Sequence, residues 1–445
     1  MEPNPYVDLP TPTSFRVAEI LPGNTSDPIS YLLHTADWKA VPSYDAVSYA
    51  WGDPNVTRPV VCEGKIVNVT ENLHSALTRL RFPDRSRNIW ADALCINQRD
   101  IPERSLQVRQ MLRIYRSAQA VLVWLGPDTA DRMAEIAVSS LFKISDFVCE
   151  RLGIPVSGLG STDTVLQEVV SRNRDCLPLP SDCDFSTAST WKSLRWLYSH
   201  PYFTRVWAIQ EIAANKVRLV YANYEITEWE RVELVASYII METTFSKEYD
   251  FSTTYCWWAA STSECAKQPK SWLFCLYLAS NYRSTDARDH VYGLRGLMDF
   301  ADGGELLDAD YSKSVTEVYR DSVEAALVNF KKTDVLLYVN GNHSPSWIPR
   351  WDEPMLFRNP FRFGKQVPWQ PTGDTKATWG IDKRANVLSL TGCVIGTVRL
   401  AESYNESIFG NALLMSEDGR SQLHMVGHVG ADDDEGIDDF VEGFV

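Results

Sequence analysis

The 445-residue sequence lacks the short motifs by which many enzymes and cofactor-binding proteins are identified. It has no phosphate-binding P-loop, no glycine fingerprint of a dinucleotide-binding fold, no paired-histidine motif of a zinc protease and no serine nucleophile elbow. The nine cysteines are irregularly spaced and include no Cys-x-x-Cys pair, which argues against a zinc ribbon or a secreted disulfide framework and favours reduced thiols. The seven histidines are dispersed, and His424 and His428 lie beside glycines near an acidic tail, so we expect no metal site.

Basic charge and long apolar runs are also scarce. The 43 Lys and Arg residues against 58 Asp and Glu give a net charge of −15 at pH 7, and phosphate binding needs a basic surface, so we expect no nucleic-acid partner. The longest apolar stretch, residues 272–279, is far shorter than the ~20 residues that span a bilayer, and the first ten residues do not resemble a signal peptide. We therefore expect no membrane span and, by default, a cytoplasmic location.

The first half of the chain has the pattern of an α/β fold. Alternating apolar and small residues over 44–51 predict a strand, and a second apolar strand begins at residue 88. Apolar residues at helical spacing predict a helix over 102–118, which a strand over 120–126 follows. Strand, helix and strand in this order predict a mainly parallel sheet flanked by helices. The residues expected on adjacent strands are Val47, Tyr49, Ile89, Ala91, Val121 and Val123.

The segment that follows mixes irregular and regular patterns. Residues 153–189 lose periodicity and are rich in Gly, Ser, Asp and Pro, which predicts an inserted loop. Thr204 is expected to cap a helix that ends near Asn215, and residues 217–221 read as a strand.

Further along, we expect a mostly helical region with a small β element. Helices are expected within 282–299 and 308–326, and a hairpin or edge strands over 387–400. Residues 347–351 suggest an extended clip that packs two indoles, and the acidic tail is expected to be mobile.

Polar residues follow the second predicted strand. Asp92 lies at its end, and Asn97 and Gln98 come soon after, which is where open α/β sheets bind polar ligands. The alternative is that Asp92 and Asn97 only cap turns. Asp100 and Glu103 form a predicted capping box, so Glu103 is read as a capping residue rather than a catalyst.

Trp207 and Glu211 are four residues apart on one predicted helix, so they should share a face. An acid beside an indole can have a raised pKa, or can hold a ligand that stacks on the ring. The alternative is a partly buried glutamate paired with an arginine such as Arg205 or Arg218, with Trp207 as ordinary core.

A mixed-charge cluster lies near residue 286. It comprises Arg283, Asp286, Arg288 and Asp289. We expect a salt-bridged helix entry with Asp286 as the N-cap, and hence a structural role.

Taken together, these segments resemble the three signature blocks of the fungal heterokaryon incompatibility (HET) domain. The blocks are residues 44–54, residues 90–126 with Trp90-Ala-Asp-Ala-Leu-Cys-Ile-Asn-Gln98 at their start, and Arg205-Val-Trp-Ala-Ile-Gln-Glu211. Residues 284–294, 310–314 and 346–351 are similar to later segments of long HET proteins. The resemblance implies a role in nonself recognition at hyphal fusion, where a HET domain triggers cell death.

A more distant resemblance is to TIR domains, because Trp207-Ala-Ile-Gln-Glu-Ile212 is similar to their Trp-x-x-x-Glu-[Leu/Ile] segment. In TIR enzymes that cleave NAD the glutamate is catalytic, which implies a catalytic role for Glu211 and makes NAD a possible substrate. No cofactor is otherwise implied. The residues expected around the ligand are Trp51, Asp92, Asn97, Gln98 and Trp207.

These inferences define the expected domains and three functional hypotheses. The domains are an N-terminal extension (1–40), a HET domain (41–222), a C-terminal region (223–400) and a tail (401–445). The protein is an NAD-cleaving effector, a non-catalytic module that signals by self-association, or a family member recruited to a biosynthetic pathway. The expected partners are a second copy of the chain or an allelic incompatibility protein.

Overall fold

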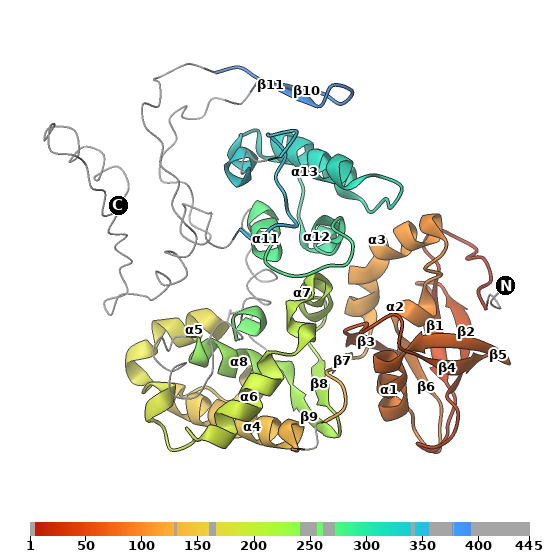
Figure 1. Ribbon diagram of the computed structural model, residues 1–445, viewed down its shortest axis with the longest axis vertical. Helices are drawn as coiled ribbons and strands as arrows, with labels where there is room; N and C mark the ends of the chain where they lie inside the picture. The colour runs from red at the N-terminus through yellow and green to blue at the C-terminus, as the bar shows by residue number, and fades with distance from the viewer. Residues whose placement is uncertain are drawn as a thin grey trace, which may run out of the picture. The chain divides into compact units, whose positions relative to one another are not determined.

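The computed structural model describes residues 5–128, 131–159, 166–240, 256–260, 272–339, 343–355, 376 and 378–392. Its largest element is a nine-stranded sheet with the strand order β5-β4-β2-β1-β6-β3-β7-β8-β9 (Figure 1). The strands are β1 (Phe15–Ile20), β2 (Ser30–Ala36), β3 (Asp45–Tyr49), β4 (Thr57–Cys62), β5 (Lys65–Thr70), β6 (Arg87–Trp90), β7 (Val121–Trp124), β8 (Arg218–Ala222) and β9 (Glu225–Glu228).

The centre of this sheet is parallel. β3 pairs with β6 on one side, with Asp45 opposite Ile89, and with β7 on the other, with Val47 opposite Leu122. β8 extends the parallel block beyond β7, and antiparallel pairs lie at both ends of the sheet. All four residues of β7 are buried, as expected for a parallel strand covered on both faces. The predicted α/β fold and the adjacency of the three strands are confirmed, with Ala91 directly after β6.

The sheet begins earlier in the chain than expected. β1 and β2 precede residue 41, where we placed the start of the domain, and β1 pairs antiparallel with β6. β1 buries Phe15, Val17, Ala18 and Ile20. Residues 1–40 therefore supply two strands to the same sheet.

Two helices and one helical turn accompany the first half of the sheet. They are α1 (Glu71–Leu80), α2 (Asp92–Cys95) and α3 (Ile101–Ser117). α3 matches the predicted helix, and the Asp100 side chain caps it by accepting from the Glu103 N–H at 2.9 Å. The Glu103 carboxylate does not complete the capping box; it accepts from buried Arg16 at 2.7 and 3.0 Å and from the Asn97 N–H.

The segment expected as an inserted loop is partly helical. α5 (Leu166–Arg172) and three 3-10 turns (Val156–Gly158, Arg174–Cys176 and Pro180–Asp182) lie within 153–189. α5 buries Leu166 and Val170, one turn apart, and packs on α8 (Trp229–Ile239). Two apolar positions are too few to reveal a helical period in the sequence. α4 (Met133–Leu152) packs against α6 (Ala188–Tyr198) and α8.

A second correction concerns the start of α7 (Val206–Ala213). Thr204 does not cap this helix; it ends a 3-10 turn (Pro201–Thr204), and its hydroxyl donates to the Pro201 carbonyl at 3.0 Å. α7 ends two residues before Asn215, whose side chain donates to the Tyr115 and Ala118 carbonyls.

The region after α8 is mostly helical, as predicted. It contains α11 (Trp272–Ala279), α12 (Asp289–Tyr292), α13 (Val315–Phe330), the 3-10 turns Arg295–Leu297, Gly304–Leu307 and Asp334–Tyr338, and a hairpin of β10 (Trp379–Asp382) and β11 (Val387–Leu390). Within the described ranges, no helix combines the length and the apolar character needed to cross a bilayer.

Three local predictions in this region change. Asp286 is not the N-cap of α12; its carboxylate accepts from the N–H and the guanidinium of Arg288, and Arg288 is the cap residue. Turns at Trp347 and Trp351 and a bend at Ile348 interrupt the extended path expected over residues 347–351, and the two indoles donate to the Asn386 carbonyl and the Ser322 hydroxyl. β11 confirms the start of the strand expected over 387–400, whereas residues 393–400, the tail and the two tail histidines lie outside the described residues.

Candidate functional site

Glu211 is the centre of a buried polar cluster between α7 and β3. The residue is 2% exposed, and its Oε2 accepts a short hydrogen bond from the Ser48 hydroxyl. Ser48 in turn accepts from the Tyr202 hydroxyl at 2.7 Å. The Arg205 guanidinium approaches both carboxylate oxygens at 3.4 Å. The glutamate therefore has one cationic and one neutral partner.

The electrostatics of Glu211 are a balance of opposing effects. Burial raises the pKa of Glu211, whereas Arg205 and the Ser48 hydrogen bond lower it, and the charge of Asp92 raises it further. The net shift is upward, so desolvation outweighs the arginine. The same burial raises the pKa of Tyr202, which keeps that hydroxyl protonated as a donor.

Asp92 lies at the carboxyl end of β6, as predicted. Its charge acts on Glu211, and its side chain also contacts residues nearer the protein surface. Its Oδ1 accepts from the Tyr49 hydroxyl at 3.0 Å, and its Oδ2 accepts from the Trp51 indole at 2.8 Å. Gln98 donates to the Asp92 carbonyl at 3.1 Å. Because Trp51 is 41% exposed, this group offers an accessible ring beside a carboxylate.

Asn97 makes its contacts in a different group. Its N–H donates to Glu103, and its side-chain oxygen accepts from the Arg99 N–H. Glu103 is also the partner of Arg16, which is 2% exposed. These contacts tie the loop after α2 to β1, in line with the alternative that Asn97 stabilises a turn.

Trp207 and Glu211 make separate contacts although they lie one turn apart. The Trp207 indole donates to Asp289 Oδ2 at 3.0 Å, and the Tyr311 hydroxyl donates to Asp289 Oδ1 at 2.6 Å. Burial raises the pKa of Asp289 to about 6, against the lowering effect of these two donors. Trp207 therefore links α7 to the downstream region.

A second link joins the same two parts of the chain. Arg205 forms an isolated parallel bridge with Arg283: the Val206 N–H donates to the Arg283 carbonyl at 3.0 Å, and the Arg283 N–H donates to the Thr204 carbonyl at 2.6 Å. The peptide groups on either side of Arg205, whose side chain faces Glu211, are therefore hydrogen-bonded to the downstream region.

Sequence reasoning missed three of these residues, Ser48, Tyr202 and Tyr311, and named Asp289 only as a structural member of the mixed-charge cluster. Ser48 carried a signal, because it is a polar residue between apolar neighbours on a strand that pairs on both sides. Tyr202 and Tyr311 carried no comparable signal, since their partners lie 154 and 22 positions away.

The arrangement provides a carboxylate near the carboxyl ends of parallel strands, with an exposed indole close to Asp92. A preorganised carboxylate can stabilise positive charge in a transition state. Among the residues that the structure describes, no three His, Cys, Asp or Glu side chains form a group that could hold a metal ion.

Comparisons with known proteins agree with the signature blocks. Residues 44–211 match the family described as Heterokaryon incompatibility protein (HET). The chain is 26% identical, over 403 residues, to "Heterokaryon incompatibility protein 6, OR allele" of Neurospora crassa, a match that covers 76% of this chain. The chain spans 58% of the length of that curated relative. No solved structure matches the chain.

Proposed function

The chain is a HET-domain protein, and we propose that it acts as a cell-death effector or signalling protein in fungal nonself recognition. The match over residues 44–211 includes all three signature blocks and ends at Glu211. The relative is named as one allele of an incompatibility protein, which supports an allelic variant or a second copy of this chain as the partner.

The observation that carries the finer proposal is the position of Glu211. It lies near the carboxyl ends of β3 and β6, within the electrostatic reach of Asp92 and next to Ser48. Ligands of open α/β sheets bind at this edge. We propose that NAD binds there, with a base or nicotinamide ring stacked on Trp51 and the reacting ribose near Glu211.

In this proposal the reaction is hydrolysis of the bond between nicotinamide and ribose. The bonding electron pair leaves with nicotinamide, and the ribosyl carbon becomes an oxocarbenium-like cation. The Glu211 carboxylate stabilises that cation; water then adds to the carbon and loses a proton, which gives ADP-ribose. Arg205 is a positioning residue, because it orients both carboxylate oxygens.

Access to Glu211 requires movement of Arg205. Glu211 is 2% exposed and the Arg205 side chain is 17% exposed, so Arg205 is the more accessible partner of the pair. The peptide groups on either side of Arg205 are bonded to Arg283, through the Thr204 carbonyl and the Val206 N–H. In the proposed mechanism, the downstream region thereby controls when the carboxylate becomes available.

The experiment is forced expression of the full chain in a fungal cell, together with incubation of the purified chain with NAD. We expect growth arrest or death, and release of nicotinamide. Unimpaired growth at verified protein levels contradicts an autonomous effector and favours a member recruited to another pathway.

A second candidate function is a non-catalytic module that signals by self-association. The burial of Glu211 and the internal pairing of both its oxygens favour this candidate. Cell death without nicotinamide release, together with concentration-dependent assembly of the purified chain, would identify it.

A further inference from the structure

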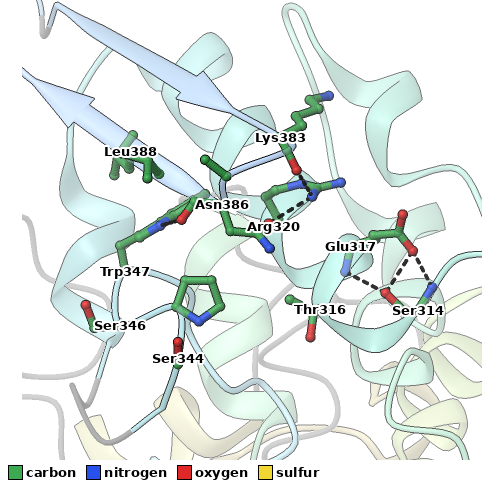
Figure 2. A pocket seen from close by; sticks show the side chains of 13 residues that line it. Ser314, Thr316, Glu317, Arg320, Ser344, Ser346, Trp347, Lys383, Asn386 and Leu388 are labelled. Carbon is green, nitrogen blue, oxygen red and sulfur yellow. Dashed lines mark hydrogen bonds between the residues drawn. The ribbon is translucent and has the colours of Figure 1, made fainter.

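A pocket of about 840 Å³ lies in the downstream region, away from the residues of the Glu211 cluster. It is bounded by the first turn of α13, by the turn over residues 344–347 and by the β10–β11 hairpin (Figure 2). Asn386 joins these three parts: its side chain accepts from Arg320 of α13, and its carbonyl accepts from the Trp347 indole. The volume falls within the roughly 300–1,000 Å³ of small-molecule sites.

Arg320 is a charged pocket-lining residue that is only 9% exposed. Its Nη1 donates to two neutral acceptors, the Lys383 carbonyl at 3.2 Å and Asn386 Oδ1 at 3.1 Å. The buried Nε has no hydrogen bond, and across the described part of the chain we find none for Nη2. Nε is enclosed by the protein and lies 3.9 Å from Asp321 Oδ1, so Nη2 is the donor left for a ligand. A guanidinium N–H binds a carboxylate or phosphate through a charge-assisted hydrogen bond.

The other charges around the pocket already have closer partners. Lys313 binds Asp321 at 2.8 Å, and Lys383 binds Glu324 at 2.6 Å. The only carboxylate in ion-pair range of Arg320 among the described residues is Asp321, at 3.9 Å from Nε. At 3.9 Å, Asp321 compensates the charge of the buried Arg320 guanidinium only weakly. A buried charge with so distant a partner favours binding of an oxyanion.

Glu317 also lines the pocket, but its carboxylate is directed to the start of α13. It accepts from the N–H and the hydroxyl of Ser314, both at 2.8 Å, and these bonds complete a capping box (Figure 2). This leaves the N–H groups of Val315 and Thr316, which have no acceptor within the helix. They are donors on the side of the pocket where Thr316 lies, while the Glu317 carboxylate offsets the helix dipole there.

The opposite wall is apolar. Trp347 is half-buried, and Leu388 lines the pocket beside it in Figure 2. A ring or an aliphatic group can pack on these side chains while an acidic group reaches Arg320.

We propose that this pocket binds a small molecule that carries a carboxylate or phosphate group attached to an apolar or ring-shaped portion. The oxyanion pairs with Nη2 of Arg320, and the apolar portion packs against Trp347 and Leu388. The proposal does not depend on NAD cleavage, and its variants leave the Glu211 cluster unchanged.

The test is calorimetric titration of the full chain with phenyl phosphate, benzoate and inorganic phosphate, up to about 10 mM so that millimolar dissociation constants are measurable. We expect saturable binding of at least one ring-bearing probe, and weaker binding of inorganic phosphate. Which ring-bearing probe binds more tightly identifies the acidic group. Equal affinity for inorganic phosphate overturns the role of the apolar wall, and no saturable binding of any probe overturns the site.

Arg320→Gln removes the charge and should weaken probe binding by about tenfold or more. Arg384→Gln is the matched control, because it removes the same charge from an exposed residue of the same hairpin that does not line the pocket. An equal loss in both variants would mean that net charge alone attracts the probes, and would overturn the assignment to Arg320.

A second pair of variants keeps the test decisive if Arg320→Gln does not fold. Leu388→Glu and Leu388→Lys place opposite charges on the same half-buried position and leave the Arg320 hydrogen bonds intact. We expect binding to be lost with glutamate and retained or strengthened with lysine. The same affinity in both contradicts an oxyanion site. Neither substitution should change nicotinamide release, so failure here is distinct from failure of the proposed reaction.

Discussion

Two buried carboxylates border α7, and they are held in different ways. Glu211, on the helix itself, is bonded to Ser48 and lies 3.4 Å from the Arg205 guanidinium. Asp289, in the downstream region, is held by two neutral donors, Trp207 and Tyr311. Burial raises the pKa of both groups. Of these two acids, only Glu211 has an arginine as a hydrogen-bond partner within the described part of the chain.

The difference separates two kinds of buried acid. The arginine beside Glu211 favours the charged form of the carboxylate and fixes its orientation, against the effect of burial on its pKa. Such an orientation suits electrostatic stabilisation of a developing cation. Asp289 is joined to neutral donors and has a pKa near 6, so its charge depends on pH and its bonds fasten one part of the chain to another. We therefore propose a functional role for Glu211 and a structural role for Asp289.

The largest expected effect comes from removing the arginine. Arg205→Leu leaves Glu211 buried beside a neutral side chain, and breaking a buried ion pair from one side costs about 3–5 kcal/mol in the free energy of unfolding. Arg104→Leu is the comparison on the Asp289 side: Arg104 pairs with Asp286 at 3.2 Å and lies over the Tyr311 ring, and its loss leaves no fully buried carboxylate without a partner, so it should cost less than the loss of Arg205. Urea denaturation at neutral pH measures both, and similar costs would remove the distinction between the two acids.

The second prediction concerns pH. The folded state raises the pKa of Asp289 to about 6, so the stability contributed by its protonated form is complete below about pH 4 and is lost as the pH rises through 6. Asp289→Asn cannot titrate. The wild type should therefore lose about 2.4 kcal/mol of unfolding free energy relative to this variant between pH 4 and pH 7. A constant difference across that range would show that Asp289 titrates normally.

The smallest effect is expected from the donors of Asp289. Tyr311→Phe keeps the ring and removes one hydrogen bond to a buried charge, which should cost about 2 kcal/mol at pH 7.5 and less at pH 5, where Asp289 is largely protonated. Thermal or urea unfolding of the variant at the two pH values checks this. A pH-independent cost would mean that the phenol acts only through packing.

Elements that depend on residues close in sequence could be predicted, and those that depend on distant residues could not. The strands around Val47 and Val121 and the helix after Asp100 were predictable, because periodicity and capping depend on near neighbours. β1 and β2 were not, since their place in the sheet depends on the pairing of β1 with β6, about 70 residues away.

The candidate site shows the same limit. Asp92 at the end of a strand and Glu211 on a helix were found from local pattern and resemblance, and the pairing with Arg205 was among the alternatives considered. The direction of the Trp207 side chain was not found, because its partner Asp289 lies 82 residues further along the chain. Helical spacing shows which side chains lie near one another on a helix, but it does not show which other residues of the fold they contact.

The most direct test of the functional assignment is nicotinamide release from NAD by purified wild type, Glu211→Gln and Asp289→Asn, expressed per folded molecule. Glutamine keeps the shape of Glu211 and removes its charge, and loss of one preorganised electrostatic group typically lowers a rate by about 10²–10³. We predict that loss for Glu211→Gln and a rate close to wild type for Asp289→Asn. Full activity of Glu211→Gln per folded molecule, or no nicotinamide release by the wild type, would contradict the assignment.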